Sequence, residues 1–294
     1  MIHTSTQLKA LVRNKSHGDN AKATTLIRNF VMERFLERIS ISTYSDKLIL
    51  KGGLLIASIV GLENRATMDM DTTIRNYNLS TADARKMIEN IIAIYLDDGI
   101  RFVIKSAESI MDGAEYPGIR FRLEASLDTM KTPLKIDIST DDVITPKEVN
   151  YEYRLMFEER SIPVLAYNLE TVLAEKMETI ISRGILNTRM RDYYDLMILS
   201  VIKSDAINYE DLAKAIEATS MKRKSYELLS DPEYVLNQIK TDTKLMEQWR
   251  IYQRKYDYAA DYNWEDIINN IENLFGKLTQ IAKPDRNSLF KERI

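Results

Sequence analysis

The sequence predicts an α+β protein, with a mixed sheet flanked by helices in its first half and only helices in its second half. Two observations carry this prediction. Short apolar or alternating runs between residues 47 and 139 have the period of strands, and beyond Pro163 apolar residues recur at helical spacing. We therefore expect two domains, residues 1–150 and 151–294, that meet in the region 145–165.

The elements follow in order along the first half. Residues 20–38 carry an apolar stripe of helical period, and residues 47–50 are a short apolar strand stopped by Gly52-Gly53. A helical segment at 54–62 leads to an alternating strand at 67–72. Ser80 is typical of a helix cap, and its helix extends to about residue 96. Further strands are expected at 101–106, 119–125 and 134–139.

The second half contains five predicted helices and no strand. Their apolar residues keep the helical period throughout. The predicted helices span residues 169–182, 189–201, 209–217, 232–254 and 264–281.

Composition excludes several kinds of chemistry. The 294 residues include no cysteine, and both histidines lie before residue 20, so thiol nucleophiles, disulfides, thiolate zinc sites and histidine triads are not expected. Any metal must be bound by carboxylates, which favours Mg²⁺ or Mn²⁺. The net charge of −3 gives no overall attraction to nucleic acid. No secretory signal or membrane-spanning run is seen, so we expect a cytoplasmic protein without membrane contact.

The first candidate site combines a glycine pair with two carboxylates. Asp69 and Asp71 are two residues apart on a predicted strand, so their side chains share a face and can bind a divalent ion. Gly52 and Gly53 follow the preceding strand, where backbone N–H groups can approach a triphosphate without a Cβ in the way. Taken singly, each motif has an ordinary alternative, a simple turn and a solvated strand face.

A third carboxylate, Asp137, lies in a strand between apolar neighbours. A buried carboxylate needs a partner, and a metal ion at Asp69 and Asp71 would supply one. Three carboxylates on neighbouring strands are what two-metal phosphoryl transfer requires. The alternative is an edge strand on which Asp137 faces water.

Charged residues also gather on two predicted helices of the second half. Lys176 and Arg183 are seven residues apart and share one helix face, a cationic strip suited to phosphates. Asp192 and Asp195 share a face of the next helix, where they could hold those cations or contact a base or ribose. The alternative is a salt-bridged helix pair.

These motifs together resemble the polymerase-β nucleotidyltransferase superfamily. More narrowly, they are similar to the four motifs of the AbiEii/AbiGii abortive-infection toxins of type IV toxin–antitoxin systems. The match covers residues 45 to 200. The similar segments are Leu50-Lys51-Gly52-Gly53, Arg65 to Asp71, Glu175-Lys176 and Arg191 to Asp195.

The resemblance implies roles for individual residues. Asp69, Asp71 and Asp137 would bind Mg²⁺ or Mn²⁺, with Asp137 as a possible general base. Lys176 would contact the triphosphate, and Asp192 or Asp195 would lie by the nucleotide. Nucleotide-binding positions would also include Lys51, Gly52, Gly53, Arg65, Thr67 and Arg183, although Arg65 and Thr67 alone indicate only a helix-to-strand connection. Leu54 replaces a small hydroxyl residue that relatives commonly have.

The family also implies a reaction and its partners. An acceptor hydroxyl would attack a nucleoside triphosphate (NTP) such as ATP or GTP. The expected acceptor is RNA, in some relatives the 3′ end of tRNA, and the expected effect is inhibition of translation or growth in phage defence. An antitoxin encoded nearby would neutralise the toxin, and the helical domain would complete the nucleotide site. The alternatives are a protein or small-molecule acceptor, or a non-catalytic nucleotide or RNA binder.

Late basic segments interleaved with aromatic residues are the sequence's only further sign of RNA binding. A basic surface with aromatic side chains can follow an RNA backbone and stack on bases. Acidic residues lie among these segments, however, so a solvated helical surface is the commoner explanation. The segments are 221–224, 249–250, 254–256 and 283–293.

Overall fold

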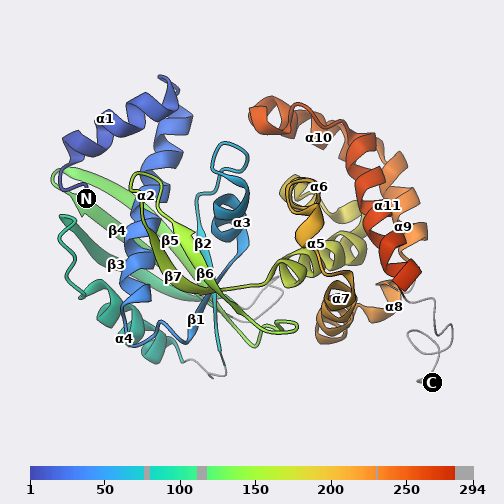
Figure 1. The fold of residues 1–294 in the computed structure, drawn as a ribbon, viewed down its shortest axis with the longest axis horizontal. Helices are drawn as coiled ribbons and strands as arrows, with labels where there is room; N and C mark the ends of the chain where they lie inside the picture. The colour runs from blue at the N-terminus through green and yellow to red at the C-terminus, as the bar shows by residue number, and fades with distance from the viewer. Residues whose placement is uncertain (76–79, 111–117, 230, 282–294) are drawn as a thin grey trace. The chain divides into compact units, whose positions relative to one another are not determined.

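The computed structural model describes residues 1–75, 80–110, 118–229 and 231–281, which form two compact units (Figure 1). The first comprises Met1–Asp142 and Glu148–Tyr167. The second comprises Val143–Lys147 and the chain from Asn168 onward. Two strands beyond residue 148 extend the sheet, so the first unit continues past the boundary expected at residue 150.

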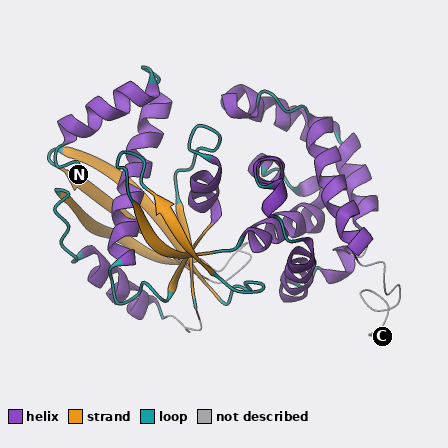
Figure 2. Ribbon diagram, viewed as in Figure 1, coloured by secondary structure: helices purple, strands orange, loops and turns teal. Residues whose placement is uncertain are grey.

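The described part of the first unit is built on one sheet of seven strands, and the mixed parallel and antiparallel pairing that the sequence predicts is confirmed (Figure 2). The spatial order is β3-β4-β5-β2-β1-β7-β6. The pairs β2/β5 and β1/β7 are parallel, and the other neighbours are antiparallel. The strands are β1 (Leu48–Lys51), β2 (Met70–Ile74), β3 (Ile100–Ile110), β4 (Gly118–Leu127), β5 (Met130–Thr140), β6 (Val149–Arg154) and β7 (Ser161–Ala166).

Four helices flank this sheet. They are α1 (Ser5–Ser16), α2 (Asn20–Ser40), α3 (Gly52–Val60) and α4 (Thr81–Ile92). α2 packs on β5 and β7, α3 packs on β1 and β2, and α4 packs on β3. The cap predicted at Ser80 is confirmed, because its hydroxyl accepts a hydrogen bond from the backbone N–H of Asp83. The helix ends at Ile92, earlier than predicted.

Alternation along the central strands gives the sheet one apolar and one polar face. In β5, Ile136 and Ile138 are buried, whereas Lys135 and Asp137 point to the opposite face. The same alternation in β4 buries Phe121 and leaves Arg120 on the polar face. The polar face therefore collects the charged side chains of neighbouring strands.

The sequence does not predict the strands β6 and β7, because Pro163 is typical of the end of a sheet region. Proline cannot donate a ladder hydrogen bond and rarely occurs inside a sheet. In β7, Pro163 pairs with Glu152 of β6, but β1 reaches β7 only at Leu165 and Ala166. Pro163 thus lies where β7 has no second neighbour, and the sheet tolerates it.

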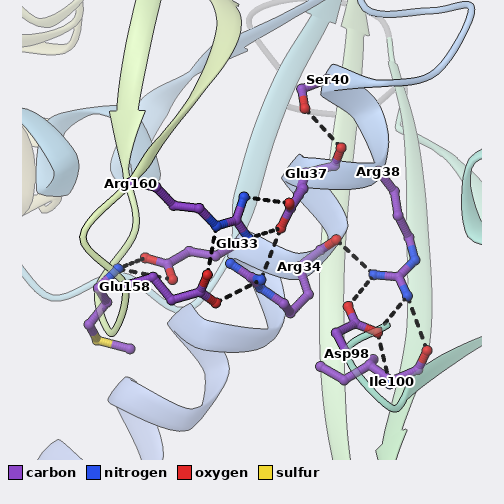
Figure 3. A network of polar contacts seen from close by, with 10 residues as sticks. Glu33, Arg34, Glu37, Arg38, Ser40, Asp98, Ile100, Glu158 and Arg160 are labelled. Carbon is purple, nitrogen blue, oxygen red and sulfur yellow. Dashed lines mark hydrogen bonds and ion pairs between the residues drawn. The ribbon is translucent and has the colours of Figure 1, made fainter. Parts of the chain in front are cut away.

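Charged side chains tie α2 to the β6–β7 connection and to β3 (Figure 3). Arg34 bridges Glu37 and Glu158, at 2.9 and 3.2 Å. Arg160 makes a two-point pair with Glu37 at 2.6 and 3.0 Å. Arg38 forms a similar buried pair, with Asp98, at 2.7 and 3.0 Å, and also donates to the carbonyl of Ile100. This network fixes α2, whose opposite side faces the apolar core.

The described part of the second unit is helical. Its α-helices are α5 (Leu169–Arg183), α6 (Met190–Ile202), α7 (Tyr209–Arg223), α8 (Tyr226–Leu229), α9 (Pro232–Thr241), α10 (Thr243–Lys255) and α11 (Trp264–Ile281). The single helix predicted at 232–254 is two helices. Asp242 has an extended backbone, and its carboxylate caps α10 by accepting from the N–H groups of Lys244 and Leu245.

Within the described segments, no helix is both long and apolar enough to cross a bilayer.

Candidate active site

Four charged residues form a row across four adjacent strands of the first unit. Strand register places Arg120 of β4 beside Asp137 of β5, Asp137 beside Asp71 of β2, and Asp71 beside Lys51 of β1. Residues paired in register project from the same face of a sheet. The sheet thus brings together Asp71 and Asp137, which are 66 positions apart in the sequence (137 − 71).

Asp69 lies just before β2, because the strand begins at Met70 and not at Thr67, where the predicted strand starts. Its carboxylate pairs with Lys135 of β5 at 2.8 Å. The same ammonium lies 3.8 Å from Asp137. Lys135 therefore stands between two of the three carboxylates that the sequence assigned to metal binding.

Asp137 has a partner that the sequence analysis missed. The guanidinium of Arg120 donates to both of its oxygens, from Nε at 2.9 Å and from Nη2 at 2.8 Å. Two-point pairs of this kind are strong and fix the orientation of both groups. Arg120 alternates with buried residues in a predicted strand, and that signal could have placed it beside Asp137 only once the pairing of the strands was known.

The crowding of carboxylates shifts the ionisation of Asp71. Burial raises the pKa of this half-buried group, and the charge of Asp137 raises it further. The charge of Lys51 acts in the opposite direction but does not cancel these effects. The ionised form of Asp71 is therefore costly in the folded protein, and a bound cation would relieve that cost.

The chain passes too close to the segment 65–71 for a side chain to fit at Gly52 or Gly53. Gly52 has a φ of 67°, and a Cβ there would lie 2.9 Å from both Cβ and Cγ of Asp71. A Cβ at Gly53 would lie 2.7 Å from the hydroxyl of Thr67 and 3.5 Å from a guanidinium nitrogen of Arg65. The glycine pair thus allows the start of α3 to pack directly on the segment that carries Asp69 and Asp71.

The predicted positions Arg65 and Thr67 are both buried in this contact. Arg65 donates to the carbonyl of Ala66, and the hydroxyl of Thr67 donates to the carbonyl of Asp69 at 3.3 Å. Asn29 of α2 donates to the carbonyl of Thr67 at 3.0 Å. The structure gives both side chains a role in shaping the approach to β2.

Lys51 is oriented by a buried acid that the sequence analysis did not single out. Its ammonium donates to Asp142, whose same oxygen accepts from Ser139 at 2.9 Å and from the hydroxyl of Tyr167 at 2.5 Å. The side chain of Asp142 is fully buried. Lys51 also lies over the ring of Tyr167. These contacts hold the cation at the first residue before Gly52.

The donors near Asp69 and Asp71 have the chemistry of a divalent-ion site, but a three-carboxylate cluster is not assembled. Within the described residues, no group of three or more acidic or histidine side chains is placed to hold a metal ion. Asp69 and Asp71 offer carboxylate oxygens, which suit Mg²⁺ and Mn²⁺. Both oxygens of Asp137 are engaged by Arg120. The arrangement fits two carboxylate ligands, and the third is committed elsewhere.

In the second unit, the residues predicted on α5 and α6 form an ion-pair cluster. Lys176 pairs with Asp192 at 2.6 Å and with Asp195 at 3.3 Å, and Arg189 pairs with Asp192 at 3.3 Å. Both aspartates are buried. Burial lowers the pKa of Lys176, but the two carboxylates together raise it above its ordinary value. Of the two roles predicted for Asp192 and Asp195, the structure shows them holding Lys176. Arg183 is the last residue of α5.

The predicted basic patch at 221–224 is only partly available to a ligand. The side chain of Arg223 is 6% exposed and pairs with Glu178 at 2.5 Å and with Glu175 at 3.0 Å, so it stabilises the helices rather than a surface. Lys222 and Lys224 are exposed. In the other segments, Arg254 pairs with Glu247, and residues 283–293 lie outside the described residues.

A mixed sheet that joins a glycine turn to one carboxylate just before the adjacent strand and one on it, with a third on the strand beyond, is the arrangement expected of nucleotidyltransferases. The chain belongs to the AbiEii family of nucleotidyltransferase toxins of type IV toxin–antitoxin systems, whose sequence pattern it matches over residues 34–270. This match confirms the resemblance inferred from the motifs, and such a family implies an NTP substrate and an antitoxin partner.

The chain is also similar to solved structures, one of which is a toxin of related fold. The nucleotidyltransferase toxin MenT4 of Mycobacterium tuberculosis H37Rv has a TM-score of 0.53 and 13% identity, with 92% of this chain and 98% of MenT4 covered. JHP933 of Helicobacter pylori has a TM-score of 0.47 and 16% identity, with 88% and 95% covered. MenT4 supports the fold. No match was found among curated proteins.

Proposed function

We propose that this toxin transfers a nucleoside monophosphate from an NTP to the 3′ hydroxyl of an RNA, with tRNA as the expected acceptor. Family membership supports the transfer, and the row that places Asp71 beside Asp137 carries the assignment of the site. In the reaction, the acceptor oxygen bonds to the α-phosphorus while the bond to the β-phosphate oxygen breaks. Pyrophosphate leaves, and the acceptor loses its hydroxyl proton.

The start of α3 is the proposed phosphate-binding element. The first N–H groups of a helix have no partner within it, and they attract anions. The glycines remove side chains from this end, and Lys51 adds a positive charge oriented by Asp142. Together these groups favour the phosphates of an NTP.

Asp69 and Asp71 are the proposed ligands of a divalent ion, Mg²⁺ or Mn²⁺. Such an ion supplies charge neutralisation on the phosphates and activates the attacking hydroxyl. Asp71 is the more constrained of the two ligands, because its carboxylate packs against Gly52. Asp137, next to Asp71 on β5, is the proposed third carboxylate and remains an expected proton acceptor.

Lys176 is the proposed cation for the triphosphate in the helical unit. Two buried aspartates fix its ammonium, so a change to either aspartate should act through Lys176. Losing Lys176 should lower kcat if the ammonium stabilises charge on the departing pyrophosphate, and raise KM alone if it binds only the ground state. We expect the fall in kcat.

Label transfer tests the proposal directly. The protein is incubated with each radiolabelled NTP, Mg²⁺ and total bacterial RNA, and RNA and protein are then separated on gels. We expect label at an RNA 3′ end, sensitive to periodate treatment of the RNA, and none with EDTA or with Asp69→Asn. Label on a protein or a small molecule would replace the RNA acceptor, and no label on any acceptor would contradict catalysis.

The toxin role has its own test. Induction of the chain in bacteria should arrest growth and reduce the incorporation of labelled amino acids, whereas the Asp71→Asn variant should do neither. An antitoxin encoded beside the gene should restore growth when it is co-expressed. If the unaltered chain and Asp71→Asn arrest growth alike, nucleotide transfer is not the cause of the toxicity.

A further inference from the structure

In the site, each of the three carboxylates proposed to bind a metal ion lies beside a positively charged side chain of the protein itself. Asp137 is held by Arg120, Asp69 is paired with Lys135, and Asp71 has Lys51 as its neighbour across the strands. These are side chains of the same sheet face, positioned by strand register. The protein thus carries its own positive charges at the place where a divalent ion is proposed to bind.

The Arg120–Asp137 pair is better formed than an ordinary surface ion pair. Nε and Nη2 each donate to a different oxygen of Asp137, within 2.9 Å. The side chain of Asp137 is 19% exposed and that of Arg120 is 32% exposed, so water screens the pair only in part. A divalent ion can take Asp137 as a ligand only if Arg120 releases at least one of these oxygens.

We infer that Arg120 competes with the divalent ion for Asp137 and keeps the affinity of the free enzyme for that ion low until a nucleotide arrives. This inference rests on the proposed function and assigns Arg120 as a positioning residue that controls the third carboxylate. The phosphates of an incoming NTP add negative charge beside Asp71, which strengthens the binding of a divalent ion and offers Arg120 another anion. The complete metal site would then form only with substrate.

The competition predicts that removing the arginine improves metal binding. We would titrate the full chain with Mn²⁺ without nucleotide, and follow the loss of the electron paramagnetic resonance signal of free Mn²⁺. Arg120→Met should bind Mn²⁺ about tenfold more tightly than the unaltered chain, because a charge-assisted two-point pair no longer has to be broken.

Arg122 provides the matched control. It lies two residues along β4 on the same face and loses the same charge when changed to methionine. Its ion pair with Glu108 is long, at 3.6 Å, and exposed. Arg122→Met should change Mn²⁺ affinity by about twofold at most, since its charge acts from farther away and is screened. Arg120→Gln serves in place of Arg120→Met if methionine prevents folding.

A double variant identifies the carboxylate that is released. In Arg120→Met/Asp137→Asn, Mn²⁺ affinity should fall back to that of Asp137→Asn alone, because the gained ligand is gone. Melting temperatures give a second readout. In EDTA, Arg120→Met should melt below the unaltered chain, since Asp137 then lies beside Asp71 without its partner, and Mn²⁺ should recover most of that loss.

Two results would overturn the inference. One is an Arg120→Met affinity no tighter than that of Arg122→Met, and the other is a gain that persists in the double variant. Label transfer by the unaltered chain is measured in parallel. Failure of that transfer counts against the proposed function, whereas unchanged Mn²⁺ affinity counts against the role of Arg120 even when transfer is seen.

Discussion

At the scale of single residues, the site shows a conflict between stability and function in Asp71. Its pKa is raised by burial and by the charge of Asp137, so the ionised form of the carboxylate opposes folding. The glycine at 52 allows Asp71 to approach α3, and any other residue there would collide with it. The fold therefore accepts an unfavourable charge at the position proposed for ligand binding.

Replacing the carboxylate of Asp71 by an amide should lower activity without lowering stability. Asp71→Asn should lower label transfer about a thousandfold, comparable with the loss of a main electrostatic stabiliser. A carboxylate whose folded-state pKa is raised costs stability above its unfolded pKa, so at pH 7.5 the variant should melt at the same temperature or higher. Transfer assays and thermal melts in EDTA measure the two effects. Near-normal transfer with added Mg²⁺ would remove Asp71 from the site.

At the scale of elements, the glycine pair joins α3 to the segment before β2. Gly53→Ala should destabilise the protein by about 1–3 kcal/mol, because the added methyl would lie 2.7 Å from the hydroxyl of Thr67. Combining it with Thr67→Ala should cost less stability than the sum of the two single changes.

Gly276 in α11 is the matched control, since a Cβ there meets nothing within 4 Å. Gly276→Ala should stabilise by up to about 1 kcal/mol. Urea unfolding of the four variants measures these differences.

The α2 network should give the protein a pH-dependent stability through Glu33. Burial raises the pKa of this carboxyl from 4.5 to about 8, although it accepts hydrogen bonds from the N–H of Met156. Between those values the folded state holds a proton that the unfolded state has lost, so stability falls as pH rises and levels off above about 8.

The Glu33→Gln variant has no such proton to lose. Its stability relative to the unaltered chain should therefore increase by roughly 3–5 kcal/mol between pH 5 and pH 9, the equivalent of the pKa shift. Urea midpoints at pH 5, 7 and 9 measure the change. Glu152→Gln, on an exposed position of β6, is the control for replacing a surface glutamate. A parallel pH profile for Glu33→Gln and the unaltered chain would contradict the buried proton.

The elements also show what sequence patterns can and cannot predict. Helical and alternating periods located α2, α11 and the central strands, since these depend on local burial. The β6–β7 hairpin was missed because the sequence does not say that Pro163 lies beyond the reach of β1. For the same reason Arg120 was missed: its contact with Asp137 depends on the register of two strands, which the motifs do not encode.

At the scale of the whole molecule, the charge available to a ligand depends on which side chains folding leaves exposed. The chain has a net charge of −3, so an RNA acceptor has to be attracted by local cations. The sequence offered Lys222, Arg223 and Lys224 as one patch. Folding divides them, because Arg223 is buried between Glu175 and Glu178 while both lysines stay exposed. A change at Arg223 would therefore remove an ion-pair partner from Glu175 and from the buried Glu178, and would report on folding, not on RNA.

The two exposed lysines give a cleaner test of RNA binding. Phosphate contacts release counterions, so RNA affinity should fall by roughly 0.7–0.9 log units per log unit of salt for each contact. Lys222→Gln/Lys224→Gln should weaken RNA binding and reduce the salt slope by up to two contacts, with NTP binding unchanged. Fluorescence anisotropy of labelled tRNA at about 50 and about 200 mM salt measures the slope.

The control removes the same charge elsewhere. Lys9 and Lys15 are both exposed on α1, so Lys9→Gln/Lys15→Gln alters the net charge equally without touching α7. If the two double variants weaken RNA binding alike, the effect comes from net charge and not from a contact near the end of α7. If neither changes the slope while label still reaches RNA, the phosphate contacts lie on other cations and not on Lys222 and Lys224.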